Sequence, residues 1–376
     1  MTQASTAPQV VDWSAAAQIA GRLAAPGPQA PRDELDALVS GLRGAAEDAV
    51  GHVLETTRML PAPPGPREDP QRGEDASRGE GGSTTLSPVV VVDRATWARA
   101  NTQSMAAMTD GIGAVVAEVS KGATSPGAQL AGAAEIGAVL ALLSGRVLGQ
   151  FDPYSGPGRL LLVAPNVLQA EQALRVPVRD FRLWVCLHEQ THALQFAAAP
   201  WLSGHLSGRT QHLITGMART SAELARARFD KKVVAIGRNV LATLRGEGGT
   251  LMDGMLTHEQ KGELADITAV MALLEGHADV MMDAVGPRVV PSVRRIRARF
   301  ERRRDGEGRN TFDTVVQKLL GMEAKLAQYR DGAVFVRAVE RAVGRDGLNA
   351  VWAAPENLPT AREIADPRAW VRRVHG

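Results

Sequence analysis

Three polar residues at helical spacing could together bind a metal ion and activate a water molecule. The segment WVCLHEQTHALQF, residues 184–196, contains His188, Glu189 and His192 in the pattern H-E-x-x-H. Residues four apart on a helix lie on the same face, so the two imidazoles can reach one zinc ion at about 2.0–2.1 Å. Glu189 can face the attacking water as general base without binding the ion itself.

The alternative is that the pattern arose by chance on an ordinary helix. With 8 histidines in 376 residues, a chance H-E-x-x-H is expected in roughly one such chain in a hundred. The motif is flanked by Leu187 and Leu194, and burying three polar side chains in such an apolar run is costly unless they have a function. We therefore expect a site for one Zn2+ ion here.

A catalytic zinc site usually has three protein ligands and a water molecule, so a third ligand is required. The sequence after His192 lacks the glycine and histidine of the short third-ligand pattern H-E-x-x-H-x-x-G-x-x-H. A later helix, predicted over 257–287, supplies Glu275, with Asp279 one turn further on. We expect Glu275 to bind zinc and Asp279 to accept a hydrogen bond from the far nitrogen of a ligand histidine, first of all His188.

The helix predicted over 257–287 has clear ends. Thr257 and Gln260 form a capping box at its start, and a Gly-Pro pair marks its end. Both acids could in principle lie on a solvated face, but the surrounding segment AVMALLEGHADVMMDAV is too apolar for that. His277 points elsewhere on an ideal helix, which makes it a second-choice ligand or a donor that faces the substrate.

The helix that carries the motif is predicted to run for about five turns. Asp180 is a plausible N-cap residue, and Pro200 cannot continue a helix. We expect Trp184 and Phe196 to pack beneath this helix. Cys186 is turned away from the metal face, so a packing role is expected for it.

The remaining sequence predicts a mainly α fold (α+β) with a small β element. Residues 1–60 form a helical segment that packs on the main domain, which spans 89–376. The stretch 61–88 is rich in Pro and Gly and almost free of large apolar side chains, which indicates a flexible linker or insertion. Short buried strands are expected at 89–94 and 159–167.

Composition narrows the class of protein. The chain has 44% hydrophobic residues, a net charge of +2 and one cysteine, so neither a disulfide framework nor a strongly charged surface is expected. No signal peptide or membrane-spanning run is recognised, which makes a cytoplasmic protein without nucleic-acid or membrane partners the expectation. The basic segment 293–304 is interpreted as a solvated helix face rather than a contact for nucleic acid or an acidic partner. The oligomeric state is left open.

The pattern H-E-x-x-H followed by a distant E-x-x-x-D resembles the gluzincin metallopeptidases. Further segments resemble a narrower group, the actinobacterial zincin-like metallopeptidases labelled coenzyme F420 biosynthesis-associated. These segments are VVVVDRATWARAN (89–101), LSGRVLGQFDPY (143–154), GRLLLVAPNV (158–167), FRLWVCLHEQTHALQF (181–196), PWLSGHL (200–206), LLGMEAKLAQYRDGAVFVRAV (319–339) and GLNAVWAAPENLPT (347–360). The resemblance covers residues 10–60 and 89–376. It implies a zincin-like fold and a zinc site at the two histidines and Glu275, with Glu189 as base.

Other residues give weaker signals. Zincins commonly use a tyrosine or histidine to stabilise the oxyanion, and Tyr329 is one of only two tyrosines in the chain. An ordinary helical tyrosine with a hydrated hydroxyl is the alternative for it. Arg146 and Asp152 lie near a predicted helix end, and either could line the cleft.

Three functions are compatible with these residues. The first is a zinc-dependent hydrolase, most simply a metallopeptidase that acts on a peptide or a small amide. The second is a zinc-binding scaffold protein without catalysis, for which Glu189 beside an open coordination position would have no use. The third is a hydrolase of a small amide in cofactor F420 metabolism, which differs from the first in the size of its cleft. No G-x-G-x-x-G follows a strand, so no further cofactor-binding residues are expected.

Overall fold

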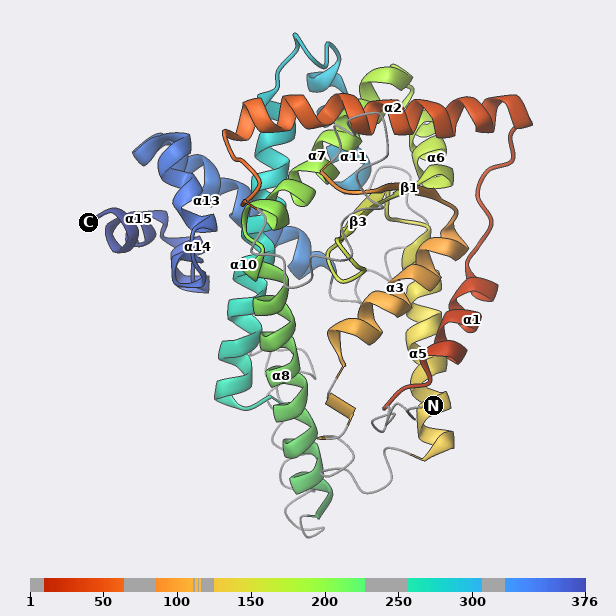
Figure 1. The fold of residues 1–376 in the computed structure, drawn as a ribbon, viewed down its shortest axis with the longest axis vertical. Coiled ribbons are helices and arrows are strands. Elements are labelled where there is room, and N and C mark those ends of the chain that lie inside the picture. The colour runs from red at the N-terminus through yellow and green to blue at the C-terminus, as the bar shows by residue number, and fades with distance from the viewer. Residues whose placement is uncertain are drawn as a thin grey trace, which may run out of the picture.

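The structure, a computed structural model, describes residues 10–63, 86–110, 112–113, 115, 125–226, 256–305 and 322–376 (Figure 1). Most of the predicted linker at 61–88 lies outside the described residues. The helices are α1 (Trp13–Leu23), α2 (Arg32–Thr57), α3 (Arg94–Met108), α5 (Pro126–Ser144), α6 (Ala164–Leu174), α7 (Val178–Ala198), α8 (Trp201–Arg226), α10 (His258–Ala284), α11 (Val293–Asp305), α13 (Met322–Leu348), α14 (Ala361–Ala365) and α15 (Pro367–His375), with short 3-10 helices η2 (Asn349–Trp352) and η3 (Pro355–Asn357). This is the mainly helical fold with a small β element that the sequence predicts.

A three-stranded mixed sheet forms the β element. Its strands are β1 (Val89–Val92), β2 (Gly149–Asp152) and β3 (Arg159–Val163), in the order β1-β3-β2. β1 pairs with β3 in parallel and β2 pairs with β3 antiparallel, so β2 is an edge strand. The strand predicted over 159–167 ends at Val163, because Pro165 occupies the first turn of α6 and favours the start of a helix.

The central strand β3 contributes to both hydrophobic cores of the protein. Side chains alternate between the two faces of a strand. Leu160 and Leu162 enter the larger core, whereas Leu161 and Val163 enter the smaller one. An uninterrupted apolar run is the sequence expected of a strand that is covered on both faces.

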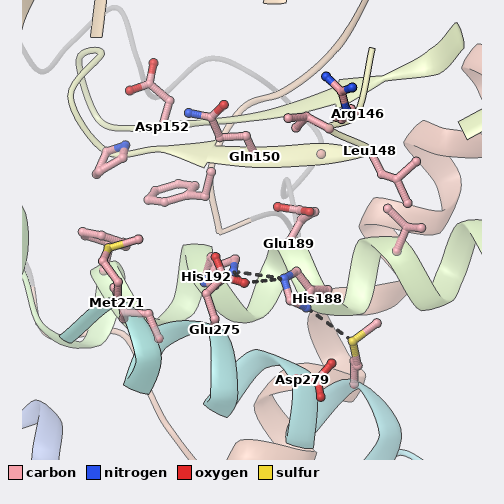
Figure 2. A pocket seen from close by; sticks show the side chains of 18 of the residues that line it. Arg146, Leu148, Gln150, Asp152, His188, Glu189, His192, Met271, Glu275 and Asp279 are labelled. Atoms are coloured by element: carbon pink, nitrogen blue, oxygen red, sulfur yellow. Dashed lines mark hydrogen bonds and ion pairs between the residues drawn. The ribbon is translucent and has the colours of Figure 1, made fainter. Parts of the chain in front are cut away.

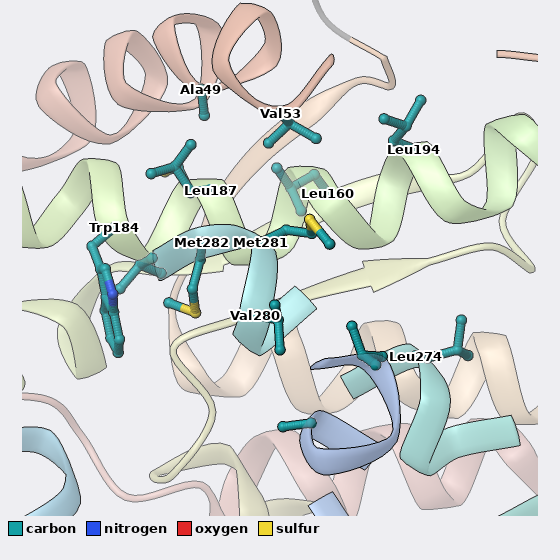
Figure 3. Close-up of a cluster of buried hydrophobic side chains, with 14 of the residues drawn as sticks. Ala49, Val53, Leu160, Trp184, Leu187, Leu194, Leu274, Val280, Met281 and Met282 are labelled. Atoms are coloured by element: carbon teal, nitrogen blue, oxygen red, sulfur yellow. The ribbon is translucent and has the colours of Figure 1, made fainter. Parts of the chain in front are cut away.

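The larger core surrounds α7, the helix that carries the H-E-x-x-H motif. α7 packs between α2 on one side and α10 and the sheet on the other. In Figure 3, Leu187 and Leu194 of α7 lie near Val53 of α2 and Met281 of α10. With apolar contacts on several sides, α7 is a rigid support for the polar residues on its remaining face.

The smaller core lies between the sheet and the helices α1, α3 and α5. Among the described helices, α5 alone is long and apolar enough to span a membrane by length and composition. This corrects the expectation that no segment of the chain reaches that limit. α5 packs against α1 and α3, and Ala133, Leu140 and Ala141 are buried there.

α10 and α13 approach each other closely where two glycines meet. A Cβ atom on Gly332 would lie 1.8 Å from the carbonyl oxygen of Ala272, and one on Gly276 would lie 2.2 Å from the backbone of Gly332. Only residues without a Cβ fit at such a distance. The crossing brings α13 against the same stretch of α10 that carries Glu275.

The ends of α7 and α10 allow a direct comparison with the sequence. α10 begins with the predicted capping box of Thr257 and Gln260 and ends just before Gly286. α7 begins three residues earlier than predicted, with Pro177 rather than Asp180 as its N-cap residue. Its carboxylate accepts hydrogen bonds from the backbone and the hydroxyl of Ser292 instead, which fastens α7 to the start of α11.

Candidate metal centre

The two motif histidines and Glu275 converge at one point between α7 and α10 (Figure 2). His188 Nε2 lies 3.2 Å from His192 Nε2. Glu275 Oε2 lies 3.5 Å from His188 Nε2 and 3.9 Å from His192 Nε2. Ligands 2.0–2.1 Å from a tetrahedral zinc ion are separated by about 3.3 Å, so these three atoms fit a single zinc ion with a fourth position left for water or substrate.

The electrostatics of this cluster favour a cation. Burial by itself would lower the pKa of His188, but its bond to Glu275 and the charges of Glu189, Glu275 and Asp279 raise it to about 9. Burial would raise the pKa of Glu275, but its contacts with the two histidines lower it to about 2. The carboxylates therefore stabilise positive charge at His188, and a divalent cation is stabilised by the same field, whereas burial lowers the pKa of His192 and keeps it neutral as a ligand must be.

Glu189 lies above the cluster, between α7 and the edge strand β2 (Figure 2). It is 6% exposed. Burial raises the pKa of its carboxyl to about 7, with a further increase from Glu275 and an opposing decrease from His188. A carboxyl with a pKa near neutrality is suited to both accepting and returning a proton.

The position of Glu189 depends on a glycine in β2. A Cβ atom on Gly149 would lie 2.6 Å from Glu189 Cγ and 2.8 Å from its Cδ. Because the glycine leaves space for the carboxylate, the strand and the helix can approach each other across it. β2 was not among the strands predicted from the sequence.

Gly149→Ala is therefore expected to displace the Glu189 carboxylate and to reduce any rate that depends on this carboxylate as a base by about 10- to 100-fold, since a misplacement of about 1 Å can cost that much. Zinc content should stay that of the wild type, because no ligand is touched. Steady-state kinetics and elemental analysis of the same samples test this. Gly204→Ala is the matched control, because a Cβ at Gly204 has nothing within 4 Å among the described residues. Equal activity in both variants would contradict the assigned contact.

A cleft of about 1300 Å³ surrounds the cluster. Apolar side chains from several elements form much of its lining: Met105, Met108, Leu148, Phe151, Trp184, Phe196, Leu206, Met271, Leu274, Met282, Phe300 and Val334. The edge strand β2 forms one wall, and α10 and α13 contribute another. A large cleft in which apolar side chains surround convergent polar groups is typical of a substrate-binding site.

Asp279 lies in this cleft but does not make the predicted hydrogen bond to His188. Its Oδ1 accepts a bond from Arg297 Nη1 at 2.6 Å, and Arg297 also donates to Asp283. His188 Nδ1 instead lies 3.3 Å from the sulfur of Met282. The predicted bond is absent because Arg297, whose side chain is 15% exposed, offers the carboxylate a charged partner.

His277 is fully buried and does not join the metal cluster. Its Nδ1 lies 3.0 Å from Gln195 Nε2, and its ring packs at 68° against Trp352. Burial, followed by the charges of His192 and Arg345, lowers its pKa to about 3. The sequence predicts His277 as a second-choice ligand or as a donor that faces the substrate. Its buried location outside the cluster agrees with neither role.

Trp184 belongs to the larger core and Phe196 packs against it, in agreement with the predicted packing, and both side chains also line the cleft. Trp184 stacks with the guanidinium of Arg297 at 5.3 Å, and Phe196 contacts Phe151 of β2 at 5.4 Å. Cys186 is buried against the backbone of α2, in agreement with a packing role.

Arg146, Asp152 and Tyr329 are the remaining residues that the sequence places in or near the site. Arg146 and Asp152 both line the cleft, but the Asp152 carboxylate is bound by Ser155 and Arg159 and is 1% exposed. Tyr329 belongs to α13, but its side chain lies outside the described residues.

Two residues of the site were missed by the sequence analysis, Tyr154 and Gln195. Tyr154 lines the cleft just after β2, and burial raises its pKa to about 12, so its hydroxyl stays protonated. Its only sequence signal is that it is one of the two tyrosines in the chain, the other being Tyr329. Gln195 contacts His192 Nδ1 at 2.9 Å, and its signal was a spacing of three residues from that ligand on the same helix.

Comparison with known proteins agrees with this geometry. No match is found among curated proteins. A solved structure from Chloroflexus aurantiacus, described as "a putative hydrolase with a novel fold", is 26% identical, with a TM-score of 0.61 over 96% of this chain and 98% of that one. A family model described as zincin-like metallopeptidase matches residues 11–371. Because that match spans nearly the whole chain, the protein belongs to the zincin-like metallopeptidase family.

Proposed function

We propose that this protein is a zinc-dependent peptidase. The observation that carries the proposal is the convergence of His188, His192 and Glu275 within reach of one ion, with Glu189 beside them. A bound zinc ion would polarise the scissile carbonyl and lower the pKa of the attacking water toward about 7. A site of purely structural zinc would have no use for a buried carboxylate with a raised pKa next to the fourth position.

The protein's own groups can carry the proton. Glu189 accepts a proton from the attacking water as the new C–O bond forms. It then donates that proton to the amine nitrogen as the C–N bond breaks, so the carboxylate is regenerated at the end. The raised pKa of Glu189 suits it to both transfers.

The cleft favours a peptide over a small amide. Pockets for small molecules usually measure about 300–1000 Å³, and this cleft is larger, about 1300 Å³. β2 is the terminal strand on one edge of the sheet and forms a wall of the cleft. An extended peptide can pair with such an edge through its backbone. The alternative, an amide in cofactor F420 metabolism, has support only from the sequence resemblance, since the family and structure matches do not mention F420.

Tyr154 is proposed as the group that stabilises the oxyanion. Removing one oxyanion donor typically costs about 10²-fold or more in kcat. Tyr154→Phe is therefore expected to lower kcat by about 10²-fold while KM and zinc content change little. Kinetics on one cleaved peptide test this, and an unchanged kcat would exclude Tyr154 from that role.

The direct test of the function is a peptide library incubated with zinc-loaded protein and read by mass spectrometry. Glu189→Gln protein serves as the background control, because it keeps every proposed ligand. Cleavage by the wild type alone supports the proposal. No cleavage above that background, in a protein that binds zinc, would favour a zinc-binding scaffold instead.

A further inference from the structure

Gln195 is a fully buried residue that lies between the candidate metal cluster and the body of α10. Its Nε2 lies 3.0 Å from the carbonyl oxygen of Leu274 and 3.0 Å from His277 Nδ1. Its Oε1 lies 2.9 Å from His192 Nδ1. All polar atoms of this side chain are therefore engaged, and its three partners are a ligand histidine, a second histidine and the backbone beside Glu275.

These contacts determine which way the amide of Gln195 is oriented. A backbone carbonyl oxygen can only accept, so the group that faces Leu274 must be the NH2. The amide oxygen is then left to face His192. This assignment does not depend on the choice of amide rotamer, which coordinates alone leave ambiguous.

The orientation of Gln195 in turn fixes the tautomers of both histidines. Since Oε1 only accepts, His192 must carry its proton on Nδ1, which leaves the lone pair of Nε2 directed at the metal cluster. The second hydrogen of the NH2 group points to His277, so Nδ1 of His277 accepts and its proton lies on Nε2. That Nε2 is buried without a hydrogen-bond partner among the described residues, and the ring packs against Trp352.

We infer that Gln195 is a positioning residue for the metal centre. It holds His192 in the tautomer that can bind zinc, and it ties this ligand to the backbone of α10 immediately before Glu275. Gln195 thereby sets the relative position of two ligands that lie 83 residues apart in the sequence. The inference rests on the zinc site proposed above and adds to it a residue outside the H-E-x-x-H motif.

The chain offers a matched control for this inference. Gln190 lies on the same helix, is equally buried, and donates one hydrogen bond to a backbone carbonyl, that of Ala46, at 2.9 Å. Ala46 belongs to α2, on the side of α7 away from α10. Substitutions at Gln190 and Gln195 therefore remove comparable buried amides, but only one of them contacts a proposed zinc ligand.

The experiment measures zinc affinity by competition with a chromophoric chelator for the wild type, Gln195→Met, Gln190→Met and Gln195→Glu. Methionine keeps the length of glutamine without its hydrogen bonds. Thermal unfolding and circular dichroism of the metal-free proteins establish that each variant folds. The visible absorption spectrum of the Co2+-loaded proteins reports the coordination geometry independently of catalysis.

Gln195→Met is expected to lose about 10- to 100-fold in zinc affinity, the usual cost of removing a group that orients a ligand histidine. Gln190→Met should bind zinc like the wild type even if it loses similar stability. Gln195→Glu should lose less affinity than Gln195→Met, because one carboxyl oxygen still accepts from His192, although the carboxylate can no longer donate to the Leu274 carbonyl. Equal affinities in Gln195→Met and the wild type, or equal losses in Gln195→Met and Gln195→Glu, would overturn the inference. A wild type that binds no zinc would overturn the proposed function itself.

Discussion

Glu189→Gln is expected to lower the rate of hydrolysis by about 10²- to 10⁴-fold, the usual contribution of a positioned general base. Glutamine has nearly the same shape but cannot accept a proton from water at neutral pH. The three proposed ligands, His188, His192 and Glu275, remain unchanged, so the protein should still bind one zinc ion. Steady-state kinetics together with elemental analysis measure both quantities on the same preparation.

A control for this variant should remove a buried carboxylate elsewhere. Glu171 is 6% exposed and pairs with Arg182 on the side of α7 that faces α6. Glu171→Gln is expected to reduce stability but not the activity of the folded protein. If Glu189→Gln retained the activity of wild type, Glu189 would not be the base and the proposed reaction would need another proton acceptor.

Glu275→Gln is expected to lose its bound zinc ion, whereas Glu189→Gln is expected to keep zinc and to lose only the proton transfer. A neutral amide is a poor zinc donor, and the change also removes the negative charge that favours a cation at this site. The loss of affinity should exceed the ~10–100-fold that follows when a group that merely orients a ligand is removed. Zinc titration against a chelator measures it, and activity should recover in part when zinc is added in excess.

Asp279→Asn is the matched control for Glu275→Gln, because Asp279 lies one turn further along the same helix and in the same cleft. Its carboxylate is bound by Arg297 and makes no hydrogen bond to a proposed ligand. Its zinc affinity should therefore change much less than that of Glu275→Gln. If Glu275→Gln bound zinc as tightly as the wild type, Glu275 would not be the third ligand.

The geometry of the candidate site could be predicted from the sequence where it depends on local structure. His188 and His192 are one helical turn apart, so their convergence follows from α7 being a helix. Glu275 could be identified because an acid inside a strongly apolar helix requires a reason to be there. The capping box at Thr257 followed from its side-chain chemistry in the same way.

What the sequence could not supply are contacts between segments far apart in the chain. Arg297 reaches back to Asp279 from α11, whereas its own segment had been interpreted as a solvated basic face. β2 consists of only four residues, and it forms a strand because β3 pairs with it. Gln195 matters because α10 places a backbone carbonyl next to it. Each of these depends on tertiary packing, which local propensity does not encode.

The glycine pair at the crossing of α10 and α13 limits how the cleft can change its width. Because Gly332 touches the backbone around Ala272, there is no side chain at that point whose rotation could let the helices slide apart. The cleft residues Ala333 and Val334 follow directly on Gly332 and must move together with the helix that carries Glu275. A substrate that pushed against this wall would therefore displace Glu275, the proposed third ligand, so selection by size and integrity of the proposed metal site cannot vary independently.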